Sequence, residues 1–414
     1  MNLTPSLSLS EKNKKHPQML PTTLRDEATG TLRHTMRDGV VQDWDCLEAL
    51  LHRTFYGRLG WEAGADEGAV LFSEQVLTPR RDRERLAALC FERFGLAGMF
   101  VAEAPVLALY SVGRSSGLVA DVGHDGASVA AVVDGAAVAA ASRRVTSGGG
   151  GGGEPSTSSS SSSSSLSAPL GGLAAERVLR ARVAARVGDE RAGAIPEDAL
   201  RAAKHAVCRV AASAAEAAGS RGAAAAASAS AAAAGGTGAP STAPSKHVLP
   251  DGTELEVTAS DGAAAGEALV SPQFFLPPSG GDGSGGASGG SSADGGRQRQ
   301  HPSLAELLSL ALSSVPDANS RKLASEGLLV CGGGSNAPGL GARILAEGGG
   351  ALPPSHPAPP PLLSVPDYVP ASMAASAAWA GGAILARVVF QQQQHVSRAE
   401  YDEFGPTVVH RKSA

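Results

Sequence analysis

Two glycine-containing motifs in this sequence match patterns that carry chemistry in other proteins. Gly113–Gly117 has the form G-x-S-x-G, in which Ser115 would be a nucleophile. That motif needs a strand before the serine and a helix after it, whereas the apolar spacing here predicts the reverse order. Gly332–Ala337 has the form G-x-G-x-x-A, but Ala351–Pro354 occupies the place of the acidic residue that a dinucleotide site needs about 20 residues further on. We therefore expect neither a serine hydrolase nor a dinucleotide site.

Motifs for metals and for phosphate loops are also missing from the sequence. It contains no H-E-x-x-H and no G-x-x-x-x-G-K-[ST]. The histidines are isolated from one another, and no two cysteines have the spacing of a metal-ligand pair, so we assign no metal site. The scattered cysteines are typical of reduced thiols in a cytosolic or nuclear protein; they are Cys46, Cys90, Cys208 and Cys331.

Composition narrows the class of protein further. Hydrophobic residues make up 43% of the 414 residues but aromatic residues only 4%, so the core must consist mostly of Ala, Val and Leu. A formal net charge of −5 gives no electrostatic footprint for direct binding of nucleic acid. Met1–Lys15 is polar and is no secretory signal. We find no uninterrupted apolar run of about 18 residues, and we expect no membrane span.

Three low-complexity segments interrupt the chain, and we expect them to be flexible insertions or linkers. They are Gly148–Ser165, Ala214–Ala243 and Pro277–Gly296. A Pro-rich stretch, Pro353–Pro361, predicts an extended loop.

The segments between these insertions show the periodicity of regular elements. Apolar spacing predicts helices after Asp43, after the Thr78-Pro79 pair, over Val106–Tyr110, over Leu340–Glu347, over Trp379–Phe390 and after a capping box at Ser397. Strands are predicted over Gly117–Ala120, Ser128–Val133 and Leu328–Cys331, and on both sides of an Asp251-Gly252 turn. Strands that alternate with helices indicate an α/β fold.

Several of these segments resemble actin and its relatives, and most of all the plant-type class of nuclear actin-related proteins. The resemblance rests on Asp38–Asp45, Leu59–Glu62, Val106–Gly117, Leu249–Gly252, Gly266–Leu269 and Tyr401–Lys412. It covers residues 36–145, patches of 171–275, and 303–414. It implies an actin-like two-lobed fold, of the class shared with Hsp70 and the sugar kinases, with a nucleotide in the cleft between the lobes.

The resemblance also divides the chain. Residues 1–35 form a divergent N-terminal segment, and residues 36–145 correspond to actin-like subdomain 1 and the start of subdomain 3. Residues 146–170 are a Gly/Ser linker, and 171–300 form the subdomain 3/4 region with its Ala/Gly/Ser insertions. Residues 301–365 belong to subdomain 3, and 366–414 complete subdomain 1.

The family holds ATP and Mg²⁺ with two hairpins, of which this chain retains one in part. Asp121 and Gly123 stand at the family's Asp and Gly, with His124 in place of the next acidic residue. We expect no first hairpin in residues 1–35, because no apolar strand precedes Asp26–Gly30, and we expect the family's small lobe to be truncated. The family's adenosine-side turn is matched by Gly332, Gly333 and Gly334. ATP with Mg²⁺ is the cofactor that these five positions would contact.

ATP hydrolysis is not expected. Ala104 stands where actin has the Gln that positions the attacking water, and Ser128 stands where it has a supporting His. A methyl group cannot orient a water molecule, and Glu103 could replace it only after a backbone shift.

The resemblance implies a non-catalytic scaffold subunit of a nuclear SWI/SNF-type chromatin-remodelling complex. Its partners would be a helix of the remodelling ATPase and other nuclear actin-related proteins or actin, with no nucleic acid or membrane bound directly. We expect a groove near the C-terminal helices to receive that helix. Four side chains either line or support the groove or pack in the core: Trp379, Ile384, Leu385 and Tyr401.

Two other interpretations remain open at this point. One is an ATP-hydrolysing or filament-forming cytoskeletal actin-like protein. The other is a gene prediction that lacks its first exon, so that residues 1–34 stand in for a lost hairpin.

Overall fold

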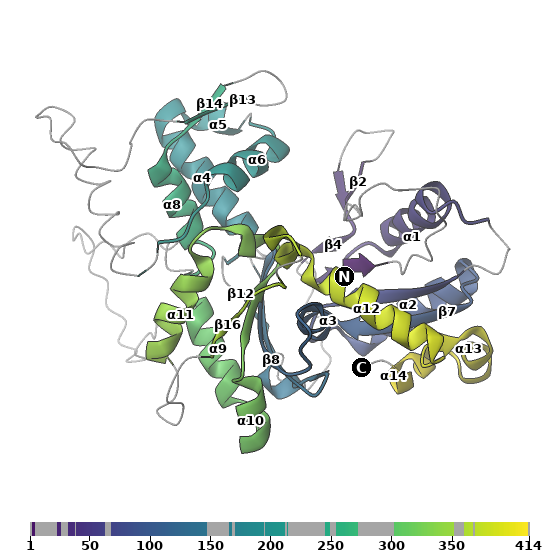
Figure 1. The fold of residues 1–414 in the computed structure, drawn as a ribbon. Coiled ribbons are helices and arrows are strands. Elements are labelled where there is room, and N and C mark those ends of the chain that lie inside the picture. The colour runs from purple at the N-terminus through teal and green to yellow at the C-terminus, as the bar shows by residue number, and fades with distance from the viewer. Residues whose placement is uncertain are drawn as a thin grey trace, which may run out of the picture.

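A computed structural model gives the fold of the chain. It describes residues 2–4, 23–25, 32–37, 39–62, 68–146, 165–167, 170–193, 195–211, 213, 245–248, 254–271, 302–351, 360–366 and 369–412. Two separate sheets, each covered by helices, form two lobes that lie side by side (Figure 1). The predicted α/β class and the two-lobed architecture are confirmed.

Lobe 1 is built around a sheet whose strand order is β1-β6-β7-β17. Its strands are β1 (Asn2–Thr4), β6 (Ala69–Glu74), β7 (Gly98–Glu103) and β17 (Val396–Ser397). The central pair β6–β7 is parallel, and both outer strands run antiparallel to it. The helices of this lobe are α1 (Trp44–His52), α2 (Arg80–Ala88), α13 (Arg398–Phe404) and α14 (Val409–Lys412). A π-helical turn extends each of the first two, over Arg53–Arg58 and Leu89–Arg93.

Two of the three helices of lobe 1 whose N-caps were predicted from the sequence begin at the predicted cap residue, and one does not. The Asp43 side chain caps α1 by accepting from the Cys46 N–H at 2.9 Å, and Ser397 forms the predicted capping box of α13. We expected Thr78 to cap α2, but the helix begins at Arg80. The Thr78 hydroxyl instead donates to the Gln75 carbonyl at 2.7 Å, and Pro79 is extended at the cap position.

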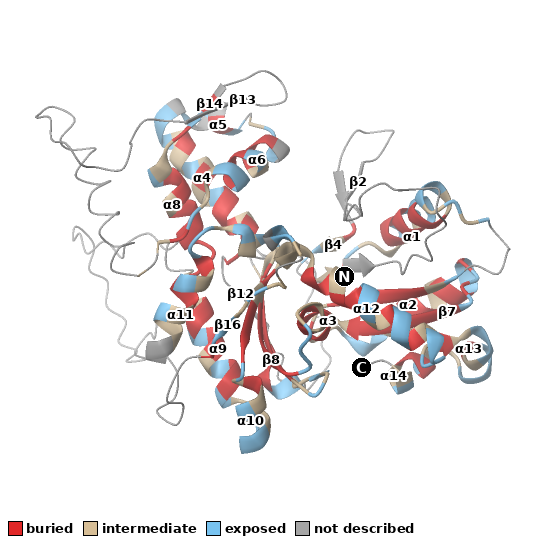
Figure 2. Ribbon diagram, viewed as in Figure 1, coloured by how far each residue is buried: buried red, intermediate tan, exposed pale blue. Residues whose placement is uncertain are grey.

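Lobe 2 contains the larger sheet, with strand order β12-β11-β9-β8-β15-β16 and β10 beside β9. These strands are β8 (Gly117–Val122), β9 (Gly126–Val133), β10 (Ala136–Ala137), β11 (Arg143–Thr146), β12 (Ser165–Ser167), β15 (Leu328–Cys331) and β16 (Leu362–Leu363). Helices α9 (Leu304–Ser313), α10 (Ala318–Ala324) and α11 (Leu340–Ala351) accompany the sheet. Figure 2 shows the sheet buried beneath them.

An outer group of helices extends lobe 2 away from its sheet (Figure 1). It consists of α4 (Gly172–Val187), α5 (Asp189–Gly193), α6 (Glu197–Val207) and α8 (Ala259–Glu267). Strands β13 (Ser245–Val248) and β14 (Glu254–Val257) pair beside them, as the Asp-Gly turn predicted, although that turn lies outside the described residues.

Two helices connect the lobes. They are α3 (Ala104–Ser111) and α12 (Ala377–Gln391), which pack against each other. A Cβ atom at Gly381 would lie 1.6 Å from the Leu107 carbonyl oxygen, so only glycine allows the helices to approach this closely. Ser372–Gln391 is long and apolar enough to cross a membrane by length and composition, which our sequence expectation had missed. Its packing on α3 and β6 accounts for the apolar residues that face inward.

The predicted insertions lie almost entirely outside the described residues, as does Asp26–Gly30. A strand, β2 (Thr23–Arg25), does precede that segment and pairs with β3 (Leu32–His34), but its sequence is Thr-Leu-Arg and it is not the apolar strand whose absence we noted. Among the described strands these two pair only with each other, so the hairpin belongs to neither main sheet. The two short strands β4 (Met36–Arg37) and β5 (Val40–Val41) follow it and lead into α1.

Candidate functional site

The β8–β9 hairpin forms as predicted, and its turn is closed by its own backbone. The Gly123 N–H donates to the Gly126 carbonyl at 2.8 Å. Gly126 lies so close to β11 that a Cβ there would meet the Val145 carbonyl oxygen at 2.1 Å. The Gly123 N–H is therefore already engaged within the turn.

The glycine turn after β15 lies beside this hairpin, because β15 runs parallel to β8 with Cys331 opposite Asp121. A Cβ atom at Gly332 would lie 2.2 Å from Asp121 Oδ1, and one at Gly334 would lie 2.5 Å from Val122 Cγ1. Gly333 is exposed and faces open space. The structure thus brings all five predicted nucleotide positions together, and packing on β8 explains why two of them are glycine.

The Asp121 carboxylate is held between the two lobes. Its Oδ1 lies against Gly332, and its Oδ2 accepts a hydrogen bond from the Gln75 side-chain amide of lobe 1 at 3.5 Å. Burial raises the pKa of Asp121, and the hydrogen bond from Gln75 opposes that rise.

The N-terminus of α4 docks onto the same hairpin. The Gly172 N–H donates to the Gly123 carbonyl at 2.9 Å, and the Leu173 N–H donates to the His124 carbonyl at 2.7 Å. The Gly332 N–H likewise donates to the Ala374 carbonyl at 3.2 Å. Of these donors, Gly332 is one of the predicted nucleotide positions, and its N–H bonds within the protein.

A cluster of charged side chains that the sequence did not reveal surrounds the hairpin on its α4 side. Lys204 Nζ donates to Glu176 Oε1 at 2.8 Å, and both side chains are largely buried. Arg201 Nε lies 3.5 Å and His124 Nδ1 3.7 Å from the same oxygen. Burial lowers the pKa of His124, whereas Glu176 and Asp125 oppose that shift. The only hint in the sequence was the replacement of an acidic residue by His124.

The two residues that replace the water-positioning Gln and His of actin, Ala104 and Ser128, lie near the ends of β7 and β8. Ala104 is buried as the first residue of α3, and Ser128 lies opposite Asp121 in the hairpin ladder. Glu103 ends β7 next to Glu74 of β6. Burial, and then the Glu74 carboxylate, raise the pKa of Glu103 to about 7.

These observations test whether Mg-ATP fits the residues present. A triphosphate needs backbone donors and a carboxylate that reaches Mg²⁺ through water. Here the N–H groups of Gly123 and Gly332 bond within the protein, and Asp121 bonds to Gln75. Within the described ranges, no group of three His, Cys, Asp or Glu side chains could hold a metal. The described residues therefore fit Mg-ATP poorly, and contact with nucleotide at the five positions stays a prediction.

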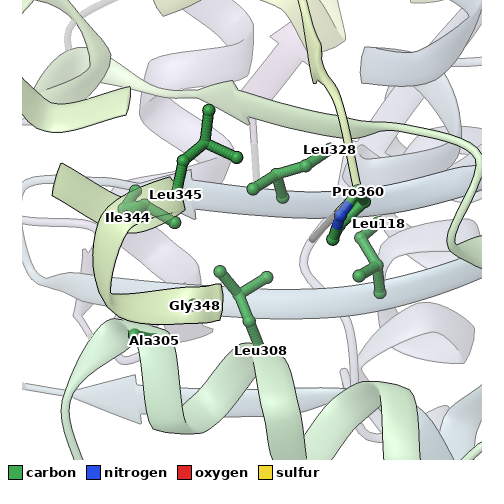
Figure 3. A pocket seen from close by; sticks show the side chains of 8 residues that line it. All are labelled: Leu118, Ala305, Leu308, Leu328, Ile344, Leu345, Gly348 and Pro360. Carbon is green, nitrogen blue, oxygen red and sulfur yellow. The ribbon is translucent and has the colours of Figure 1, made fainter. Parts of the chain in front are cut away.

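An apolar pocket lies between the lobe 2 sheet and α9 and α11 (Figure 3). Every lining residue is apolar, among them Leu118, Leu308 and Ile344. A ligand site needs a few polar groups that fix orientation, so this pocket is a packing gap of the core.

Comparison with known proteins agrees with this architecture. The sequence model of the family described as Actin matches residues 11–414. That match begins further toward the N-terminus than residue 36, where the resemblance found in the sequence begins.

Individual relatives agree with the family match. Actin-related protein 7 of Arabidopsis thaliana is 31% identical over 392 residues, which cover 95% of this chain and 87% of the relative. Actin-related protein 7 of Oryza sativa subsp. indica is 32% identical over 377 residues, or 90% of this chain and 84% of the relative. Actin-like protein 7B of Mus musculus is 37% identical over 112 residues, or 27% of this chain and 26% of the relative. The chain belongs to the actin family.

Proposed function

We propose that this protein is a non-catalytic scaffold subunit of a nuclear SWI/SNF-type chromatin-remodelling complex, in which it binds a helix of the remodelling ATPase. Its similarity along nearly its whole length to proteins named Actin-related protein 7 supports an actin-related protein. The resemblance to the plant-type nuclear class supports the remodelling complex and the nucleus as its place of action.

The observation that carries the proposal is the exposed face of α12. One side of this helix packs on α3, and the other presents Ala383, Ile384, Arg387 and Val388 to solvent. Ile384 is 54% exposed and Val388 44% exposed, and their spacing of four residues places them on one helix face. An amphipathic helix with apolar residues for this face and an acidic residue near Arg387 fits it.

The four side chains that the sequence suggested for this groove have different environments. Tyr401 is a core residue, since its ring stacks on Phe91 at 4.6 Å and its hydroxyl donates to Glu92 at 2.6 Å. Trp379 and Leu385 are half-buried. Ile384 is the one of the four that is exposed, and it is the side chain we assign to partner binding.

The candidate site supports the proposal that the protein lacks ATPase activity. Hydrolysis requires phosphates held in place and an oriented water. The donors of Gly123 and Gly332 and the Asp121 carboxylate are engaged internally, and Ala104 supplies only a methyl group. We propose that the protein turns over ATP far more slowly than a filament-forming actin.

Binding is tested with the isolated ATPase helix and titration calorimetry. We expect Ile384→Glu to weaken binding at least about tenfold, because it places a charge in an apolar contact. Leu310→Glu is the matched control, since Leu310 is 46% exposed but lies on α9 of lobe 2. Equal affinities for the two variants would remove α12 as the binding face. Recovery from nuclear extract with cytoskeletal filaments alone, and with no remodelling ATPase, would contradict the scaffold role.

The alternative function is an ATP-hydrolysing or filament-forming actin-like protein. Its specific support is the family match itself, since the actin family generally binds nucleotide with Mg²⁺. Steady phosphate release by the purified protein, together with salt-induced sedimentation, would favour it over the scaffold.

A further inference from the structure

Polar side chains join the two lobes at a place separate from the α3–α12 connection. Gln75 follows β6 in lobe 1, and its amide donates to Asp121 Oδ2 of lobe 2 at 3.5 Å. Arg144 of β11 in lobe 2 reaches in the opposite direction, and its Nη1 donates to the Val76 carbonyl of lobe 1 at 3.4 Å. Both bonds are long, but each lobe supplies one donor and one acceptor.

The β4–β5 turn completes this contact. Gly39 has a φ of +72°, and a Cβ atom there would lie 3.0 Å from Arg144 Nη1 and 3.2 Å from Gln75 Cγ. The backbone of the turn therefore lies against the Arg144 donor and the aliphatic part of the Gln75 side chain. We call Gly39, Gln75, Val76, Asp121 and Arg144 the interlobe cluster.

The surroundings of the interlobe cluster make its bonds costly to break. Val76 is fully buried, Gln75, Asp121 and Arg144 are half-buried, and burial raises the pKa of Asp121. In such surroundings hydrogen bonds are stronger than in water, and a group left without its partner is destabilising. Separation of the lobes would exchange the Arg144–Val76 and Gln75–Asp121 bonds for bonds to water, so each bond contributes its net free energy relative to water.

We propose that the interlobe cluster is a latch that keeps the two lobes closed when no ligand lies between them. Gln75 of lobe 1 donates to one oxygen of the Asp121 carboxylate in lobe 2, so groups of the protein itself make this contact between the lobes. The latch sets the angle between the lobes, and α3 and α12 act as the hinge about which they would open. This inference does not depend on the chromatin partner.

The latch is tested by measuring the distance between the lobes by fluorescence energy transfer in the full-length protein. Dyes are attached at Ala49→Cys on α1 and Asn319→Cys on α10, both exposed positions, in a Cys208→Ser background. We expect Gln75→Ala to raise the population of open molecules about fivefold, as the loss of one hydrogen bond would. Gln75→Glu should open the lobes further, because it places a carboxylate against Asp121.

Gln392→Ala is the matched control, since Gln392 is an exposed glutamine beyond the end of α12. Circular dichroism establishes that each variant is folded. If folding is impaired in the Gln75 variants, Arg144→Lys provides a milder test of the second bond. The latch is refuted if the Gln75 variants match the control, or if millimolar Mg-ATP closes wild-type molecules that are open without it. The latch is supported if wild-type molecules are closed at every Mg-ATP concentration and the Gln75 variants are open.

Discussion

Glu103 should make the stability of this protein depend on pH near neutrality. Burial and the neighbouring Glu74 raise the pKa of Glu103 from 4.5 to about 7 in the folded protein. The folded state therefore holds a proton more tightly than the unfolded state. The stability that this proton contributes is fully present below about pH 4.5 and is lost as the pH rises through about 7.

The magnitude follows from the two pKa values. A rise from 4.5 to about 7 corresponds to about 3 kcal/mol between the two limits. Glu103 is not fully buried, so solvent screening reduces the effect to about 1–2 kcal/mol. Glu103→Gln keeps the shape of the side chain but cannot ionise. We expect the variant to match the wild type near pH 5 and to exceed its stability by about 1–2 kcal/mol at pH 8.5.

Urea denaturation of both proteins at several pH values measures this difference directly. Glu403→Gln serves as the control, because Glu403 is exposed on α13. A stability difference between Glu103→Gln and wild type that stays constant from pH 5 to pH 8.5 would show that Glu103 is not held in the protonated form, and the reasoning would fail.

Two further predictions concern the stability of the fold, one at a buried ion pair and one at a close contact between helices. Arg343 pairs with Glu267 through two hydrogen bonds of 3.1 and 3.0 Å, and both side chains are 3% exposed. Arg343→Ala should lower the free energy of unfolding by about 3–5 kcal/mol, because it leaves a buried carboxylate without its cation. Replacing Arg343 by a hydrophobic residue together with Glu267→Leu should recover most of that loss in urea melts. Gly381→Ala should lower the free energy of unfolding by about 1–3 kcal/mol or more, because the added methyl group would collide with the Leu107 carbonyl. The control is Ala383→Ser on the exposed face of the same helix, which should change the melting temperature little.

Local patterns in the sequence predicted the elements well. Asp43 and Ser397 were identified as caps from their residue types, and the Asp121–Gly126 turn between two apolar runs indicated the β8–β9 hairpin. Side-chain chemistry within three or four residues determines such features, so a single sequence carries them. Thr78 shows the limit, because its hydroxyl had an alternative acceptor at the Gln75 carbonyl.

Contacts between distant segments could not be predicted in this way. Gln75 and Asp121 are 46 positions apart, and Glu176 and Lys204 are 28 apart. Neither pair lies on one helix face or on facing strands, so no periodicity connects them. The sequence located Asp121 and Gly332 as neighbours only through the family resemblance, and it could not show that Gln75 already binds the carboxylate.

Lobe 1 is assembled from segments far apart in the sequence, and this affects how the chain folds during synthesis. Its core joins residues from both ends of the sequence, because β17 pairs with β7 and Tyr401 stacks on Phe91. The core of the lobe 2 sheet comes from the interior of the chain, between Leu118 and Ile344. On the ribosome, lobe 2 can therefore collapse first, whereas β7 keeps an unpaired edge until the last twenty or so residues emerge. Truncation before Val396 removes β17, so it should leave that edge open and produce aggregation during synthesis, even though the candidate site in lobe 2 is intact.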